Sequence, residues 1–301
     1  MTAAAQIAGL TFRQDYFDDP QGWCAISDLL LETFGVDISP LDKLGGHDRT
    51  NLPSAFFDDG GRCIANLSAF SMPLMIDGGV VRAAGLQSGA VRPEYRGRGL
   101  FRELIRITLA RCEAHGYEAL VLYTDKPGLY EPHGFVTIPQ QHFRGPPPPP
   151  LPRGAVRPMR PLRIDDPEDL ALIKRVLAER TPVSSRFAVT AQSEMFLLNS
   201  YLVSGTRLAY LHQSDAVVAW RQSETRGFEL LDIAGQQIPA LATILAALDA
   251  EPGHVTVHVP PDRLEWEGTP EAAAGDLVFM VRGTPSLIPD KPFCLSPMAE
   301  F

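Results

Sequence analysis

The sequence lacks an uninterrupted apolar run of about 18 residues, the length that a membrane-spanning helix needs. Its N-terminus, MTAAAQIAGLTFRQDYF, also lacks the basic segment followed by a long apolar stretch that is typical of a secretory signal. These two absences predict a cytoplasmic protein that does not bind membranes.

Cysteine is scarce, and its spacing excludes the common metal frameworks. The four cysteines are Cys24, Cys63, Cys112 and Cys294. They form neither a C-x-x-C pair nor any other zinc-ligand spacing. We therefore expect reduced thiols and no bound metal.

An excess of basic residues is also missing. The formal net charge is −9, and each half of the chain is acidic, which excludes a typical basic nucleic-acid-binding module. Apolar residues make up 45% and charged residues 21% of the chain, values typical of a folded globular protein.

What the sequence does contain is a proline run, RGPPPPPLPRG, at residues 144–154. Consecutive prolines favour an extended polyproline II segment that is too stiff for a tight turn. The run predicts a spacer between two domains. We expect a first domain at residues 1–145, a linker at 146–154, a second domain at 155–283 and a tail at 284–301.

The apolar pattern predicts the same order of elements on both sides of this spacer. A helix at PQGWCAISDLLLETFGV precedes strands punctuated by Asp59-Gly60 and Asp77-Gly78, which are hairpin signals. A long amphipathic helix then runs from Leu100 towards Gly116, followed by the strand EALVLYT and one last strand, FVTIPQQHF. The fold class that follows is α+β, with mixed, mostly antiparallel sheets flanked by helices.

The stretch VRPEYRGRGLF lies between a strand and this long helix. A helix N-terminus offers backbone N–H donors and a partial positive charge, which suit a phosphate. Gly97 and Gly99 would let the backbone approach such a ligand, and Arg96 and Arg98 could add forked hydrogen bonds. The corresponding DIAGQQIPALA in the second half lacks arginine, so we expect no phosphate site there.

The RGRGLF stretch resembles the R-x-x-G-x-G/A loop of the GNAT (Gcn5-related N-acetyltransferase) superfamily, and LYEPHGF is similar to the superfamily's Y-x-x-x-G-F. The order of elements resembles the tandem layout of enhanced-intracellular-survival-type acetyltransferases. That resemblance covers the chain up to Gly283, and the sequence shows no sterol-carrier-like domain after it. The resemblance implies two tandem GNAT-like domains, of which only the first has a cofactor loop.

The resemblance also implies which residues bind acetyl-CoA. Backbone groups at the end of a strand would pair with the pantetheine arm, the loop would hold the pyrophosphate, and one carboxylate would lie near the cofactor. These residues are, respectively, Gly89, Ala90 and Val91; Arg96, Gly97, Arg98, Gly99, Leu100 and Phe101; and Asp125.

Two residues are the expected catalytic groups. Tyr130 occupies the superfamily's tyrosine position and is expected to protonate the departing thiolate. In the relatives that the layout resembles, a terminal Phe carboxylate reaches the active site, so Phe301 is the expected base. The expected reaction moves an acetyl group from acetyl-CoA to a primary amine by direct attack.

Two alternatives stay open at this point. The protein could be a CoA-binding sensor or scaffold without turnover, or an acetyltransferase that acts on protein amines rather than on a small-molecule amine. The sequence leaves a homo-oligomer open and does not identify the acceptor.

Overall fold

The computed structural model describes residues 9–223, 227–273, 275–284 and 287–301. Residues 1–8 of the expected first domain, 224–226 and 274 of the expected second domain, and 285–286 of the expected tail lie outside this described part. The chain forms two compact units, and each is described by itself. The first comprises residues 1–71, 82–122 and Phe301, and the second comprises residues 72–81 and 123–300.

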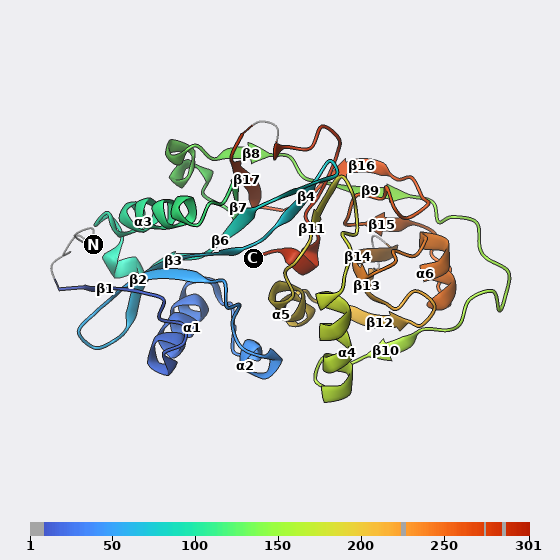
Figure 1. Ribbon diagram of the computed structural model, residues 1–301, viewed down its shortest axis with the longest axis horizontal. Coiled ribbons are helices and arrows are strands. Elements are labelled where there is room, and N and C mark those ends of the chain that lie inside the picture. The colour runs from blue at the N-terminus through green and yellow to red at the C-terminus, as the bar shows by residue number, and fades with distance from the viewer. Residues whose placement is uncertain (1–8, 224–226, 274, 285–286) are drawn as a thin grey trace. The chain divides into compact units, whose positions relative to one another are not determined.

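The first unit is a sheet covered by helices (Figure 1). Its strands follow the order β1-β2-β3-β6-β7, in which every neighbouring pair is antiparallel except the parallel pair β6 and β7. Its elements are β1 (Thr11–Gln14), α1 (Pro20–Phe34), α2 (Pro40–Leu44), β2 (Leu52–Phe57), β3 (Cys63–Ser71), β6 (Ala83–Val91), α3 (Leu100–Ala114) and the first four residues of β7 (Ala119–Thr124).

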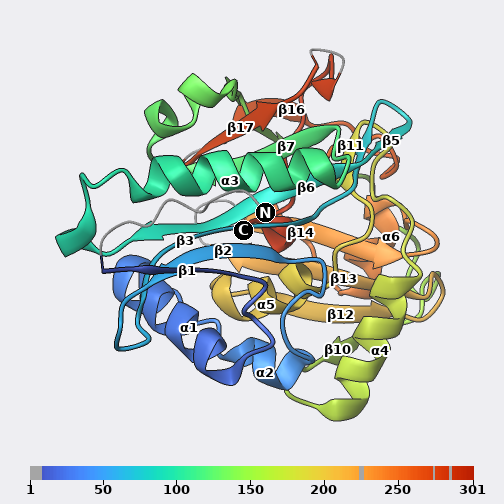
Figure 2. The same ribbon diagram turned by 60° about the vertical axis from the view of Figure 1, so that its left-hand side comes forward.

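The two long helices form where the sequence supplies an apolar stripe and suitable ends. Asp19 caps α1 by accepting a hydrogen bond from the backbone N–H of Gln21, and Gly35 ends the helix with a left-handed φ of 68°. In α3 the predicted stripe Leu100, Leu104, Thr108 and Cys112 is buried. Figure 2 shows α1 and α3 on opposite faces of the first unit's sheet.

The second unit holds a sheet of order β10-β12-β13-β14-β15-β9-β16, a small sheet β11-β4-β5, and the antiparallel pair β8 and β17. Its strands before the proline run are β4 (Leu74–Ile76), β5 (Gly79–Val81), β8 (Val136–Ile138) and β9 (Gln141–Gly145). Its later elements are β10 (Arg160–Leu162), α4 (Pro167–Ala178), β11 (Phe187–Val189), α5 (Glu194–Leu202), β12 (Arg207–Leu211), β13 (Ala216–Ser223), β14 (Gly227–Gly235), α6 (Leu241–Ala247), β15 (Val255–Val257), β16 (Thr269–Ala272) and β17 (Val278–Arg282).

The two units repeat one pattern of strand pairing, as the sequence predicts. In the second unit β10, β12, β13 and β14 pair antiparallel in turn, β14 and β15 are parallel, and α6 connects that parallel pair. In the first unit α3 connects the parallel pair β6 and β7. The predicted α+β class with tandem, mostly antiparallel sheets is confirmed.

One strand prediction is wrong. The stretch FVTIPQQHF was expected to form a single last strand, but it forms β8 and β9, which have different partners: β8 pairs with β17, whereas β9 pairs with β15 and β16. Pro139 separates them, because proline has no N–H to donate to a sheet.

The proline run lies in the loop that joins β9 to β10 in the second unit (Figure 1). Elements from both sides of the run pair with each other, because β8 and β9 precede it whereas β17 and β15 follow it. Because strands pair across the run, the run does not by itself locate the edges of the domains, and the boundaries expected from it stay a prediction. Among the residues described, no helix is both long and apolar enough to cross a bilayer.

Candidate functional site

The strand β6 continues past its parallel neighbour. The last pair between β6 and β7 joins Gly85 to Val121, whereas β6 runs on to Val91. Of the strand-end residues predicted to bind a ligand, Gly89 and Val91 are half-buried, and Ala90 is buried opposite Asn66 of β3. The end of β6 is thus held on one side by β3 and extends beyond β7 on the other.

A buried asparagine stabilises the backbone conformation at this end of β6. Ser88 has a positive φ of 58°, and the β3–β6 register shifts between Asn66 and Ser68. The Asn66 side chain donates to the Ser88 carbonyl oxygen at 2.9 Å and accepts a hydrogen bond from the Tyr16 hydroxyl at 2.7 Å. Sequence analysis did not identify these residues, although an asparagine within the apolar strand CIANLSAFS was the available signal.

The loop after β6 places the start of α3 beside the strand end. Gly97 and Gly99 both have left-handed backbones, with φ of 76° and 78°. A Cβ on Gly97 would meet no atom within 4 Å, so in this structure the need for glycine is conformational rather than steric. Gly99 precedes the first residue of α3 and has no side chain with which to cap it. The first turn of α3 therefore begins without the side-chain acceptor that usually covers its N–H groups.

The arginines of VRPEYRGRGLF divide into one buried and two exposed side chains. Arg92 is 3% exposed, donates from Nε to the Cys63 carbonyl oxygen and forms an ion pair with Glu32, so it stabilises the fold. Arg96 and Arg98, the two predicted ligand-binding arginines, are exposed.

Each exposed arginine makes one backbone hydrogen bond within the loop. Arg96 donates from Nε to the Val91 carbonyl oxygen at 3.2 Å, and Arg98 donates from Nη2 to the Glu94 carbonyl oxygen at 3.0 Å. The Arg98 guanidinium also lies 4.6 Å from the Tyr95 ring centroid. Since a guanidinium carries five N–H donors, both side chains are oriented while keeping donors for a ligand.

Leu100 and Phe101 open α3. Leu100 is 1% exposed and Phe101 is half-buried, so their side chains anchor the helix start to the first unit. Because Leu100 is buried, any ligand contact from it would come from its backbone.

The remaining predicted polar groups, Asp125 and Tyr130, belong to the second unit. Asp125 is exposed and its carboxylate lies 3.2 Å from the Lys126 ammonium. Tyr130 is 7% exposed, and its ring packs edge-on against Phe135 at 5.8 Å between centroids. Burial, with a smaller effect of the Asp125 charge, raises the pKa of Tyr130 to about 12. Tyr130 is therefore protonated at neutral pH.

Phe301 belongs to the first unit although it follows the second in sequence. Its ring packs edge-on against Phe70 of β3 at 5.2 Å between centroids. Gly85, at the point where β6 leaves β7, makes room for both rings, because a Cβ there would lie 2.6 Å from the Phe70 ring and 3.0 Å from the Phe301 ring.

Replacing Gly85 with alanine is expected to lower the free energy of unfolding by about 1–3 kcal/mol, the usual cost of an overpacked core. Urea denaturation of the variant would measure this. Gly128→Ala is the matched control, because a Cβ on Gly128 meets nothing within 4 Å. Equal unfolding midpoints for the two variants would contradict the close approach of the rings to Gly85.

The preceding residue, Glu300, is held through its backbone. Its carbonyl oxygen accepts a hydrogen bond of 2.7 Å from Nδ2 of the buried Asn199 on α5. The side chain keeps contact with solvent, yet desolvation by surrounding protein raises the pKa of Glu300 to about 7, against an opposing effect of the Arg221 charge.

This pKa predicts a pH-dependent stability. A carboxyl whose folded-state pKa is raised by desolvation is protonated in both the folded and the unfolded state below its ordinary pKa of 4.5, so it costs no stability there; the fold loses stability as the pH rises from 4.5 towards 7. We expect Glu300→Gln to gain stability relative to the unmodified protein across that window. Urea unfolding at several pH values would show it, and a difference that does not change with pH would refute the shift.

In the second unit, other residues of the same unit occupy the position that corresponds to the end of β6, beyond the last parallel pair. The last pair between β14 and β15 joins Leu230 to Val257. Just beyond it, the Leu231 carbonyl oxygen accepts a hydrogen bond from the Ser296 hydroxyl, and the Gly235 carbonyl oxygen accepts one from the Thr181 N–H.

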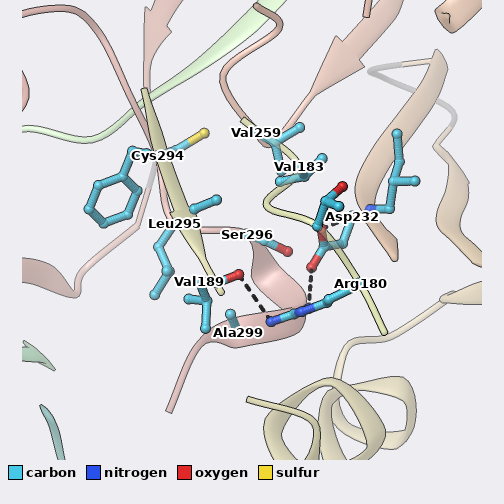
Figure 3. Close-up of a pocket in the computed structure, with 13 residues that line it drawn as sticks. Arg180, Val183, Val189, Asp232, Val259, Cys294, Leu295, Ser296 and Ala299 are labelled. Atoms are coloured by element: carbon cyan, nitrogen blue, oxygen red, sulfur yellow. Dashed lines mark hydrogen bonds and ion pairs between the residues drawn. The ribbon is translucent and has the colours of Figure 1, made fainter. Parts of the chain in front are cut away.

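A small cavity of about 10 Å³ lies there, roughly the space for one water molecule. Figure 3 shows the buried Arg180 and Asp232 facing each other in it, with 4.0 Å between Nη1 and the carboxylate. Burial raises the pKa of Asp232.

A family comparison covers most of the elements described above. Residues 47–138 match the model of an acetyltransferase (GNAT) domain. The chain carries a GNAT acetyltransferase domain. The matched range includes the end of β6, the glycine–arginine loop, α3 and Tyr130.

Solved structures resemble 91% of the chain, whereas no curated protein matches the sequence. A probable N-acyltransferase from Enterococcus faecalis has a TM-score of 0.60 at 14% identity, and covers 91% of this chain and 72% of its own. A GCN5-related N-acetyltransferase from Kribbella flavida has a TM-score of 0.56 at 16% identity, with 91% and 71% covered. Eis1 from Mycobacterium abscessus has a TM-score of 0.58 at 15% identity, with 91% and 73% covered. At these identities the likeness concerns the fold, and it confirms the predicted tandem GNAT layout.

Proposed function

We propose that this protein is an acetyl-CoA-dependent N-acetyltransferase that acts on a primary amine. The observation that carries the proposal is the start of α3. A GNAT domain here combines two left-handed glycines, two exposed arginines and a helix N-terminus without a side-chain cap, directly after a strand that extends past its neighbour.

The residues present fit acetyl-CoA. Backbone N–H groups of the first turn of α3, with Arg96 and Arg98, suit a pyrophosphate. The peptide groups of Gly89, Ala90 and Val91 suit the amides of a pantetheine arm. When bound, acetyl-CoA supplies an acetyl group activated as a thioester.

The transfer forms a carbon–nitrogen bond and breaks a carbon–sulfur bond, so the amine must lose a proton and the sulfur must gain one. Tyr130 is the proposed donor towards the sulfur. Its pKa of about 12 lies above the ordinary thiol value of about 8.5. Tyr130 therefore donates a hydrogen bond to the sulfur as negative charge develops there, and passes its proton to the sulfur as the carbon–sulfur bond breaks. The tyrosinate, the stronger base of the two, takes a proton back from water.

The amine must also lose a proton, and the carboxylate of Phe301 is the predicted acceptor. A short glycine–serine extension after Phe301 converts that carboxylate into an amide. We expect kcat to fall about 10²–10⁴-fold while the Kd for acetyl-CoA is unchanged. The same extension placed before Met1 is the control, and full activity of both extended proteins would exclude Phe301 as the base.

Thiol release from acetyl-CoA by the purified protein tests the function itself. The assay would use polyamines, aminoglycosides, amino acids and lysine peptides as acceptors, with acetyl-CoA binding measured separately. Amine-dependent release would support the transferase, and release with lysine peptides alone would point to a protein acceptor. Binding without turnover would favour a CoA-binding sensor, whereas no binding would refute the assignment of the loop.

A further inference from the structure

The second unit contains an open cavity that the proposed acetyl transfer does not use. Its volume is about 430 Å³, within the range of small-molecule sites. The cavity lies at the edge strand β10 and is lined by Met159, Pro161, Leu162, Ile164, Ser200, Thr206, Arg207, Leu208 and Trp220.

Paired strands supply much of the wall. Leu162 of β10 lies opposite Leu208 of β12, and Arg207 of β12 lies opposite Trp220 of β13. Leu162, Leu208 and Trp220 are buried. The Trp220 ring also stacks on Phe228, at 5.5 Å between centroids and 18° between planes. These contacts hold the apolar part of the cavity in place on regular secondary structure.

The charge of the cavity lining is positive. Arg207 is the single charged residue that lines the cavity, in a chain of net charge −9. Its guanidinium lies 5.1 Å from the Trp220 ring centroid, and within the described part of the chain it forms no salt bridge. A stacked guanidinium keeps its N–H edges available for the forked hydrogen bonds that a carboxylate accepts.

The polar groups of the cavity wall differ in whether their hydrogen-bond donors are already used. The hydroxyls of Ser200 and Thr206 already donate to the carbonyl oxygens of Phe196 and Val203. The indole Nε1–H of Trp220 is buried and has no acceptor among the residues described. Because that nitrogen has no accessible surface, it does not face the open cavity. The lining group with unused donors is therefore the Arg207 guanidinium, which favours a ligand that accepts hydrogen bonds.

We propose that this cavity binds a small carboxylate with an extended apolar body, whose carboxylate pairs with Arg207 and whose body lies among Met159, Ile164 and Leu208. An ammonium ligand is disfavoured because no carboxylate of the lining would pair with it and Arg207 would repel it. This site is separate from the acetyl-transfer residues, so it does not depend on the proposed function.

Isothermal titration calorimetry with decanoate as the probe tests the site in the full-length protein. We expect saturable binding of one decanoate per chain, and binding at least about tenfold weaker in Arg207→Gln, the change that loss of roughly 1.4 kcal/mol of charged hydrogen bonding gives. Arg163→Gln is the matched control, because Arg163 is exposed in the same unit and outside the cavity. Ile164→Glu, which puts a negative charge in the wall, should also weaken binding.

Two further measurements separate a specific site from adsorption to an apolar surface. Decyltrimethylammonium has a similar chain and the opposite charge, and it should not bind. Tryptophan fluorescence should change on decanoate addition in the unmodified protein and much less in Trp220→Phe. Equal binding of the cation, equal affinity of Arg207→Gln and Arg163→Gln, or no saturable heat would overturn the proposal.

Discussion

Replacing Tyr130 with phenylalanine is expected to lower kcat about 10²–10⁴-fold, the usual contribution of a general acid. The change removes one hydroxyl and keeps the ring that packs against Phe135, so the fold should be retained. The Kd for acetyl-CoA should not change, because the hydroxyl is proposed to act on charge that develops on sulfur during the reaction. Steady-state kinetics of thiol release, with acetyl-CoA binding measured in parallel, would separate these effects.

The pH dependence gives this prediction a second part. With a pKa of about 12, Tyr130 keeps its proton throughout the range in which activity is measured, so its ionisation should not produce an alkaline loss of activity below about pH 11. Tyr201→Phe is the control, because that tyrosine is 41% exposed in the same unit. A Tyr130→Phe protein as active as the Tyr201→Phe control would exclude Tyr130 as the proton donor.

The double change Arg96→Gln with Arg98→Gln is expected to raise the Kd for acetyl-CoA about 10²–10⁴-fold. Each hydrogen bond to a charged group contributes about 1.5–3 kcal/mol, and both side chains are exposed, so stability should change little. Added salt should weaken binding to the unmodified protein more than to the variant, because screening acts on the charges that the variant has lost.

Arg49→Gln is the control for this second prediction. Arg49 is an exposed arginine of the same unit that pairs with Asp18, outside the loop. A calorimetric Kd for the double variant equal to that of the control would show that Arg96 and Arg98 do not hold the phosphates.

The loop could be predicted from sequence because its properties are local. Glycine readily adopts the left-handed backbone seen at Gly97 and Gly99. The apolar stripe from Leu100 to Cys112 follows the spacing of three and four residues that marks one face of a helix. The helix start was therefore predictable within the first turn of α3. The same kind of local reasoning could not separate Arg92, which is buried, from Arg96 and Arg98, which are exposed.

The roles of several other site residues depend on their burial, which the spacing of residues in the sequence does not show. Asn66 supports the bulge at Ser88 through contacts with residues distant in the chain, and Tyr130 acquires its raised pKa from the protein around it. Gly85 carried no signal in the sequence, because its importance depends on the rings of Phe70 and Phe301. None of these properties follows from neighbouring residues.

The sequence by itself determined the α+β class, the repeated order of elements and the glycine–arginine start of α3, since each depends on periodicity or on the backbone preferences of single residues. The tertiary structure alone decided that β8 pairs with β17, that β9 lies between β15 and β16, and that the segment 72–81 belongs with the second unit. Strand pairing joins backbone groups that are nearly identical in every residue, so the local sequence specifies a strand without specifying its partner.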